Sequence, residues 1–389
     1  MKDVLEKTEL TIGYMPLTDS LPLLVADAHG YFQEQGLDVS LQQEVSWANI
    51  RDKVLVGHLD AAQMLAPMLI ATHLGLGGLK KPMMTPFAFA LNGNGFTISN
   101  QLASELDRIA GCNVMADAAL AGNALKQLVE ERRQQQLPVL LFATVYPYSI
   151  HNLLLRDWLS ANGIDPDLDV ALVVLPPSQM VDHLSQQNID GFFAGAPWNS
   201  VAIQRGVGSC LLASNDLWHS APDKVLGMTS AWAETHPNVV KALVRALDKA
   251  CRWIDHNRQQ AASIMTRYVN VPEAAVLPAL TGQFTYRTEQ PPIHQPDMLV
   301  FHRYLANYPW AEHGAWFLHQ LQRWNWAKTD IDTESLVREC YRADLYCEAL
   351  GHHTLGEHLQ QGLSFRHEQP WQLGDVPMAA TAFSYQSSL

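Results

Sequence analysis

The sequence predicts an α/β protein built from two lobes and a helical C-terminal region. Three observations support this prediction. The chain of 389 residues is too long for one ordinary domain, and hydrophobic residues make up 48% of it, which suits two buried cores. Strand and helix patterns alternate through about the first 200 residues. From about residue 238 the strand patterns fade and helical, aromatic-rich periodicity replaces them.

The first block has the order strand, helix, strand, helix, strand. We expect these elements at residues 10–14, 21–35, 37–41, 47–57 and 61–65. Such an order implies a parallel sheet with helices on its faces. Ligands of these sheets bind beyond the carboxyl ends of the strands, which directs attention to the turns after Tyr14, Val45 and Leu65.

A second block repeats the pattern. We expect strands within 91–99 and at 113–115, 139–145, 169–175 and 191–194, with helices at 151–161 and 177–186. The chain is expected to cross between lobes near 88–92 and 196–202. The predicted division is therefore 1–90 and 199–250 for lobe 1, 91–198 for lobe 2, and 251–389 for a mainly helical extension packed on lobe 1. Residues 369–389 have the composition of a loop.

Charge and cysteine usage restrict the function classes. A net charge of −13 with no basic run argues against direct binding to nucleic acid. Five scattered cysteines without CxxC spacing indicate reduced thiols. The start lacks the features of a secretory signal, and no stretch reaches the roughly 20 apolar residues of a spanning helix. We therefore expect a cytoplasmic protein that does not enter the membrane.

Four short motifs occur in one order along the chain. They are Ser46-Trp47-Ala48, Gly163-Ile164-Asp165-Pro166, Pro176-Pro177-Ser178-Gln179-Met180 and Gly195-Ala196-Pro197-Trp198-Asn199. Together they resemble the nitrate/bicarbonate-binding proteins of bacterial ABC transporters, over roughly residues 10–270. The resemblance implies a type II fold like that of periplasmic binding proteins, with two α/β lobes around a ligand cleft. It is greatest to the cytoplasmic nitrate/nitrite sensor branch (NasS type), whose members work with an RNA-binding antiterminator of the ANTAR class.

The resemblance also implies a ligand site. Matched motif by motif, the ligand-binding residues are Trp47, Asn94, Gly95, His151, Pro177 and Lys224. Two departures from the family stand out. Transport proteins usually have Glu where this chain has Ala196, and small residues where Tyr148 stands before the histidine.

The chemistry of these residues suits a flat monoanion with three acceptor oxygens. Lys224 supplies a cation, His151 a ring donor at a helix start, Asn94 an amide, and Trp47 an indole N–H with a planar face. Glycines 93 and 95 are expected to leave backbone N–H groups open to the ligand. Bicarbonate needs an acceptor for its O–H, and its binders in this family replace the lysine with a carboxylate and recruit calcium. Lys224 therefore favours nitrate or nitrite, and we expect Lys224→Ala to lose affinity and keep the fold.

Each residue taken alone has a simpler interpretation. Trp47 fits a core aromatic, His151 a helix cap, Lys224 a surface lysine, and Asn92-Gly93-Asn94-Gly95 a turn. Only the ordered set points to binding. The histidines at 352, 353 and 358 lack the spacing of a metal site, and we predict no metal, cofactor or catalytic residue.

Three functions are compatible with the sequence. The preferred one is a cytoplasmic nitrate/nitrite sensor, not an enzyme, that holds an ANTAR-type regulator when ligand-free and releases it on binding, controlling nitrate assimilation genes by antitermination. The first alternative is the substrate-binding component of a nitrate ABC transporter. The second is an enzyme like the pyrimidine synthases of thiamine biosynthesis, although their cysteine-rich iron motif has no counterpart here.

Overall fold

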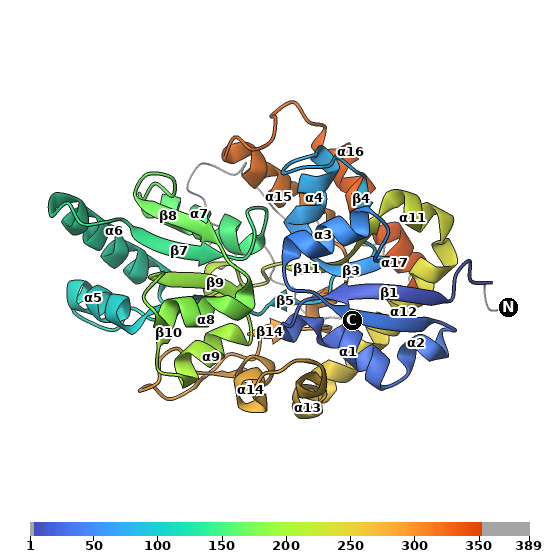
Figure 1. The fold of residues 1–389 in the computed structure, drawn as a ribbon, viewed down its shortest axis with the longest axis horizontal. Coiled ribbons are helices and arrows are strands. Elements are labelled where there is room, and N and C mark those ends of the chain that lie inside the picture. The colour runs from blue at the N-terminus through green and yellow to red at the C-terminus, as the bar shows by residue number, and fades with distance from the viewer. Residues whose placement is uncertain (1–3, 352–389) are drawn as a thin grey trace.

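The computed structural model describes residues 4–351 and has two lobes, each organised around a five-stranded sheet (Figure 1). The predicted two-lobed α/β fold is confirmed. The predicted loop at 369–389 and the histidines at 352, 353 and 358 lie outside the described residues. Within residues 4–351, no helix is both long and apolar enough to cross a membrane.

The sheet of lobe 1 has the order β2-β1-β3-β11-β4. Strands β1 (Glu9–Tyr14), β2 (Asp38–Gln43) and β3 (Ala61–Leu65) are parallel, whereas β11 (Lys224–Thr229) runs antiparallel to β3 and to β4 (Met83–Met84). Lys224 therefore pairs with Leu65, at the carboxyl end of β3. The helix expected at 21–35 is two helices, α1 (Leu21–Ala28) and α2 (Tyr31–Glu34), because Gly30 adopts a left-handed φ of 71° between them.

The sheet of lobe 2 has the order β10-β6-β9-β7-β8. Strands β7 (Leu140–Thr144), β8 (Val170–Val174) and β9 (Gly191–Gly195) are parallel, and β6 (Asn94–Ser99) is antiparallel to β9 and to β10 (Gly208–Ala213). Asn94 pairs with Gly195, at the carboxyl end of β9. In both lobes an antiparallel strand thus begins at the carboxyl edge of the parallel strands, which is the edge where ligands of such sheets bind.

One expected strand of lobe 2 does not form. Residues 113–115 lie in the turn between α5 (Asn100–Ala110) and α6 (Ala118–Gln134). The side chain of Val114 is fully buried there, and its N–H donates to Asp107 Oδ1 at 3.0 Å. The strand prediction was therefore wrong. The apolar pattern of this segment reflects a buried loop, whose backbone is held by the Asp107 side chain instead of a neighbouring strand.

The return to lobe 1 comes later than predicted. The first crossing lies near the predicted residues 88–92 and includes β5 (Leu91–Asn92), which pairs with β14 (Leu299–Val300). The predicted return at residue 199 is wrong, because α9 (Trp198–Gln204) and β10 remain with lobe 2, where β10 pairs with β6. The second crossing occupies residues 214–223 and contains α10 (Ser214–Leu217).

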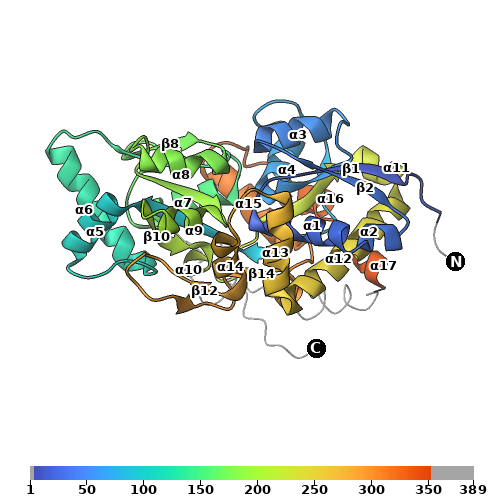
Figure 2. The same ribbon diagram turned by 60° about the horizontal axis from the view of Figure 1, so that its bottom comes forward.

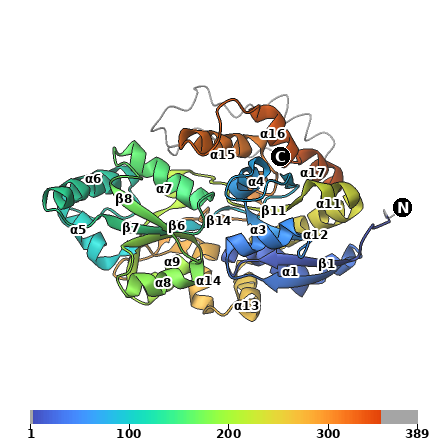
Figure 3. The ribbon, with the colours of Figure 1, turned by 45° about the horizontal axis from the view of Figure 1, so that its top comes forward.

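The region after β11 is mainly helical, as predicted, but it packs on both lobes. Its helices are α11 (Ser230–Thr235), α12 (Pro237–His256), α13 (Arg258–Tyr268), α14 (Glu273–Thr281), α15 (Ala311–Arg323), α16 (Thr333–Cys340) and α17 (Ala343–Leu350). Helix α12 covers α1 of lobe 1, whereas α14 contacts α9 of lobe 2 (Figure 2). Helices α15 and α16 lie along α4 (Ala66–Leu74) of lobe 1 (Figure 3).

A buried ion pair explains why α15 also reaches lobe 2. Arg323, the last residue of α15, pairs with Asp157 of α7 (Ile150–Ala161), and both side chains are almost fully buried. The guanidinium of Arg156, also on α7, lies 4.4 Å from the ring centroid of Trp324. The extension therefore contacts lobe 2 as well as lobe 1, on which it was predicted to pack.

Candidate functional site

A fully buried lysine forms the centre of the site. The ammonium of Lys224, at the start of β11, pairs with Asp223 and lies 2.9 Å from Asp19 Oδ2. Asp19 belongs to a short 3-10 helix, η1 (Thr18–Ser20), in the connection that follows β1. Gln63 of β3 donates to Asp19 Oδ1 and accepts from the Met15 N–H at 2.9 Å, so the carboxylate is held from the sheet side.

Asn94 joins this lysine cluster to lobe 2. Its Nδ2 donates to Asp223 Oδ2 at 2.8 Å, and its Oδ1 lies 2.8 Å from Nε2 of His151. Since the carboxylate accepts from the amide nitrogen, the amide oxygen faces the histidine and Nε2 is the protonated ring nitrogen. Nδ1 of neutral His151 is then a hydrogen-bond acceptor.

The start of α7 fixes His151 in place. His151 is the second residue of the helix, and Ser149 caps it by accepting from the Asn152 N–H at 3.2 Å. Its side chain is fully buried, with the Phe193 ring perpendicular to it at 5.8 Å. Burial and the charge of Lys224 lower the pKa of His151 well below its ordinary value, so the ring is neutral at pH 7.

Trp47 forms an aromatic wall beside the lysine. It opens α3 (Trp47–Leu55), whose N-terminus is capped by Ser46, which accepts from the Asn49 N–H. The side chain is 1% exposed, and Nζ of Lys224 lies 5.7 Å from the ring centroid, within the range of a cation–π interaction.

The charges of the cluster are linked. Burial and the charge of Asp19 raise the pKa of Asp223 from the ordinary 3.8 to about 6, although Lys224 opposes the shift. Burial disfavours the charged form of Lys224, but the two carboxylates outweigh it and raise the pKa of the ammonium. With all three groups ionised the cluster carries one net negative charge.

Several buried polar atoms in and beside the cluster are unsatisfied. Trp47 Nε1, His151 Nδ1, Asp223 Oδ1 and Thr18 Oγ1 are buried and have no hydrogen-bond partner within residues 4–351. An unsatisfied buried group costs about 1–3 kcal/mol. Their positions in and beside one cluster at the carboxyl edges of both sheets indicate a binding site for a small polar ligand.

The lobes contact each other around this cluster. The Thr18 N–H donates to the Ala196 carbonyl at 2.8 Å, and Arg51 Nη1 donates to the Tyr146 hydroxyl at 2.7 Å. Gly195 permits the close approach, since a Cβ there would lie 3.2 Å from Asn94 Oδ1 and 3.6 Å from an oxygen of Asp19. The cluster is therefore enclosed between the lobes.

Four of the six predicted site residues meet in this place: Trp47, Asn94, His151 and Lys224. Gly95 follows Asn94 on β6, but a Cβ there would meet Cys210 Sγ at 2.9 Å, so its lack of a side chain serves packing inside lobe 2. Pro177 opens α8 (Pro177–Ser185) after β8, at the same sheet edge. None of the polar contacts described above involves it.

One expectation about the backbone was wrong. The Gly93 N–H donates to the Met298 carbonyl at 2.8 Å, so it is not open to a ligand. The ammonium of Lys224 is paired with two buried carboxylates. These carboxylates, and Gln63 behind Asp19, were missed from sequence. Asp223 directly precedes the lysine, and Asp19 lies in the turn after Tyr14 that the sheet rule had indicated.

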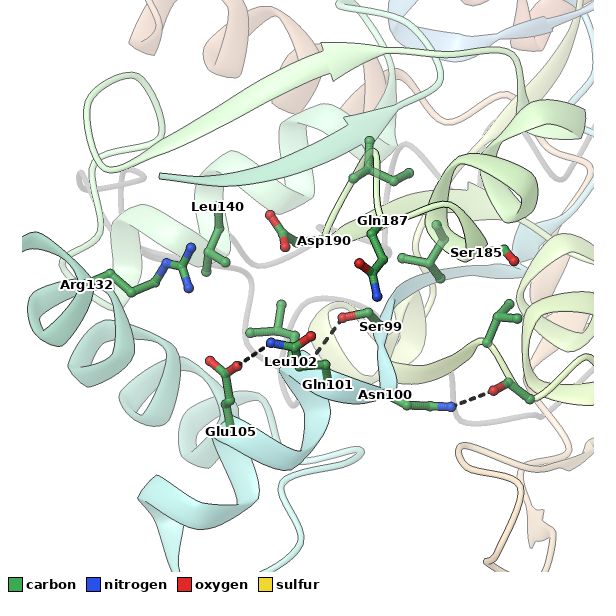
Figure 4. A pocket seen from close by; sticks show the side chains of 14 residues that line it. Ser99, Asn100, Gln101, Leu102, Glu105, Arg132, Leu140, Ser185, Gln187 and Asp190 are labelled. Atoms are coloured by element: carbon green, nitrogen blue, oxygen red, sulfur yellow. Dashed lines mark hydrogen bonds between the residues drawn. The ribbon is translucent and has the colours of Figure 1, made fainter. Parts of the chain in front are cut away.

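A separate pocket of about 420 Å³ lies at the opposite edge of the lobe 2 sheet (Figure 4). It is bounded by the start of β7, at Leu140, and by the end of β6, at Ser99. Among its polar side chains, Gln101 donates to Glu105 at 3.1 Å and Asn100 donates to the Gly206 carbonyl at 2.8 Å. Within the described chain, no group of three His, Cys, Asp or Glu residues is arranged to hold a metal ion.

Comparison with known proteins places the chain in a family. The model of the NMT1-like family matches residues 3–269. The chain is 36% identical over 354 residues to the nitrate import ATP-binding protein NrtC of Synechocystis sp. PCC 6803, covering 90% of this chain and 51% of that protein. It is 35% identical over 404 residues to the bicarbonate transport ATP-binding protein CmpC of Synechococcus elongatus, covering 99% and 55%. The chain thus spans about half the length of these two relatives.

Other matches extend over most of both chains. The nitrate/nitrite binding protein NrtA of Nostoc sp. PCC 7120 is 30% identical over 356 residues, covering 88% of this chain and 77% of that protein. The periplasmic nitrate-binding protein NrtA from Synechocystis PCC 6803 has a similar structure, with a TM-score of 0.83, 27% identity and 91% coverage of each chain. These findings confirm the fold and the resemblance to the nitrate/bicarbonate-binding proteins. The chain belongs to the NMT1-like family and, within it, to the nitrate/bicarbonate-binding proteins.

Proposed function

We propose that the chain binds one nitrate or nitrite ion between its lobes, against the cluster of Lys224, Asp19, Asp223, Asn94, His151 and Trp47. The observation that carries the proposal is the coincidence of a buried ammonium with unsatisfied buried polar atoms where the lobes meet. Trp47 Nε1 and the Thr18 hydroxyl are donors without a partner within residues 4–351. They suit a ligand whose oxygens only accept hydrogen bonds. The similarity to nitrate-binding proteins supports this choice of anion.

Bicarbonate is a second candidate, favoured by a specific observation. Asp223 Oδ1 and His151 Nδ1 are unsatisfied acceptors when Asp223 is ionised and His151 is neutral. Either atom can accept the O–H of bicarbonate, which nitrate lacks. A relative named for bicarbonate transport is also 35% identical. Lys224 provides a positive charge where bicarbonate binders of the family use a carboxylate and calcium. Nitrate or nitrite therefore remains the preferred ligand.

Calorimetric titration tests both candidates, with nitrate and nitrite at pH 6 and bicarbonate at pH 7.5, where it is mainly the monoanion. We expect nitrate, nitrite or both to bind one-to-one without calcium, and sulfate to bind far more weakly because the cluster has no second cation for a second charge. Arg132→Ala is a matched control, because Arg132 lines the separate pocket of lobe 2 and its removal should leave the affinity unchanged. Equal binding of sulfate and nitrate would refute the assignment, and binding of bicarbonate alone would transfer it to the second candidate.

We also propose that the protein is a cytoplasmic sensor that reports occupancy to an ANTAR-type RNA-binding regulator. Two points support this. All five cysteines are free thiols and Cys112 is exposed, which suits a reducing compartment. By the resemblance described above, Ala196 stands where transport proteins of the family usually have Glu.

The proposed output is release of the regulator on ligand binding. If the partner binds the ligand-free form better, ligand binding lowers the affinity for the partner. By reciprocity, the bound partner lowers the affinity for the ligand by the same factor. A net charge of −13 suits a basic, RNA-binding partner and speeds the encounter. Co-purification with such a regulator should succeed without nitrate and fail in millimolar nitrate. A complex that is equally stable in both conditions would contradict the sensor and favour a transport component.

A further inference from the structure

Asp223 has one oxygen engaged and one oxygen unsatisfied. Its Oδ2 accepts from Lys224 Nζ and from Asn94 Nδ2 at 2.8 Å. Its Oδ1 is buried and has no partner in the described part of the chain. If the carboxyl group is protonated, the proton belongs on Oδ1, because Oδ2 already faces two donors. A proton at this position makes Oδ1 a donor beside the ammonium.

An anion without a proton meets a mismatch in the ionised cluster. Asp19 and Asp223 together outweigh Lys224, and His151 presents Nδ1 as a lone pair. A nitrate ion would therefore face two acceptor atoms and one net negative charge. Both problems disappear when a single proton is added to Asp223 Oδ1, because the cluster becomes neutral and gains a donor.

We propose that the site binds its oxyanion together with one proton, which Asp223 Oδ1 holds and donates to an anion oxygen. This inference rests on the proposed function and assigns Asp223 as a specificity-determining residue. No covalent bond to the anion forms or breaks; the proton comes from solvent and returns there when the anion leaves. An oxyanion that already carries its own proton, such as bicarbonate, can instead donate to Oδ1 and needs no proton uptake.

The surroundings of Asp223 support this assignment. The groups that face it are the adjacent Lys224 at the start of β11, Asp19 from η1, Asn94 from β6 and, through Asn94, His151 from α7. Burial and Asp19 raise the pKa of Asp223, so the proton is acquired near neutral pH. Lys224 and burial keep His151 neutral, which makes the histidine the less favourable proton carrier.

Calorimetry at pH 7.5 in two buffers with different ionisation enthalpies measures the protons taken up per anion. We expect about one proton per nitrate in the parent, none per bicarbonate, and a nitrate Kd that rises by up to tenfold per pH unit above about pH 6. Asp223→Asn should take up no proton, and its Kd should no longer depend on pH. Asp216→Asn is the control, since Asp216 is also a carboxyl whose pKa is raised by burial but pairs with Tyr286 instead of Lys224.

The possible results separate this inference from the proposed function. Nitrate binding with no proton uptake would overturn the inference and leave the function standing. Failure of nitrate, nitrite and bicarbonate to bind at any pH from 5.5 to 8 would overturn the function itself. Proton uptake that persists in Asp223→Asn but disappears in His151→Gln would show that the histidine carries the proton, which also contradicts the assignment.

Discussion

Replacing Lys224 by methionine should destabilise the protein strongly. Methionine retains most of the side-chain volume but removes the only ammonium that pairs with the two buried carboxylates, within residues 4–351. Removing one partner of a buried ion pair costs about 3–5 kcal/mol, because a charge is left buried without compensation. We therefore expect the free energy of unfolding at pH 8 to fall by that amount. The expectation from sequence, that the fold survives removal of this lysine unchanged, is replaced by this one.

Urea unfolding followed by tryptophan fluorescence measures the loss. Lys249→Met is the matched control: Lys249 pairs with Glu34 on the surface, where both side chains are about half exposed, and its replacement should cost about 1 kcal/mol or less. Adding Asp19→Asn and Asp223→Asn to Lys224→Met should restore most of the lost stability, because no buried charge then remains unpaired. Equal unfolding free energies for Lys224→Met and Lys249→Met would refute the reasoning.

The same triple variant tests binding without the complication of unfolding. It retains amide groups at positions 19 and 223 but lacks the cation. A charge-assisted hydrogen bond is worth about 1.5–3 kcal/mol, so nitrate affinity should be roughly ten- to a hundredfold lower than in the double variant with Asp19→Asn and Asp223→Asn, which keeps Lys224. An unchanged affinity would mean that Lys224 serves only to neutralise the carboxylates.

Three further predictions concern neighbouring residues. Trp47→Phe retains the ring but removes the unsatisfied Nε1 donor, so nitrate affinity measured by calorimetry should fall roughly fivefold while the unfolding free energy changes little. Arg51→Ala removes the bond to Tyr146 across the lobes, and stopped-flow measurements should show faster anion release at nearly unchanged stability. In the ligand-free protein, the raised pKa of Asp223 contributes stability that is complete below pH 3.8 and is lost as pH rises through about 6. Across this window the parent should lose about 3 kcal/mol more unfolding free energy than Asp223→Asn, as urea titrations at each pH can measure.

The fold was predictable because strand and helix periodicities are local properties of a sequence. The errors arose where contacts between residues distant in the sequence determine the local structure or the lobe to which a segment belongs. Residues 113–115 have an apolar pattern but are held as a turn by Asp107. Strand β10 belongs to lobe 2 because it pairs with β6, more than 100 residues earlier, and the sequence carries no local sign of that pairing. The extension reaches lobe 2 through Arg323 and Asp157, two residues that look like ordinary surface charges in the sequence.

Most members of the candidate cluster were named from the sequence, but its charge balance was not. Family motifs bring Trp47, Asn94, His151 and Lys224 together, and the structure places them in one network. The partnership of Lys224 with Asp19 joins residues 205 positions apart. It could be anticipated only by combining two points: ligands bind at the carboxyl edge of parallel strands, and β11 begins at that edge because it runs antiparallel to β3. The hydrogen-bonding role of each His151 ring nitrogen also depends on distant contacts, because the amide orientation of Asn94 decides which nitrogen is the donor.

The charge balance also bears on how occupancy could be reported. In this structure the lobes are already joined through Asn94 and Asp223 and through Thr18 and Ala196. Lys224 is already neutralised by carboxylates that the chain itself supplies. In the proposed complex the anion lies against Lys224 and the Oδ1 of Asp223, next to the bond from Asn94 to Asp223 that joins the lobes. A ligand shifts a conformational equilibrium only by its differential affinity for the two states. Because Asp223 contacts both Lys224 and Asn94, protonation of this one residue changes anion affinity and the contact between the lobes together.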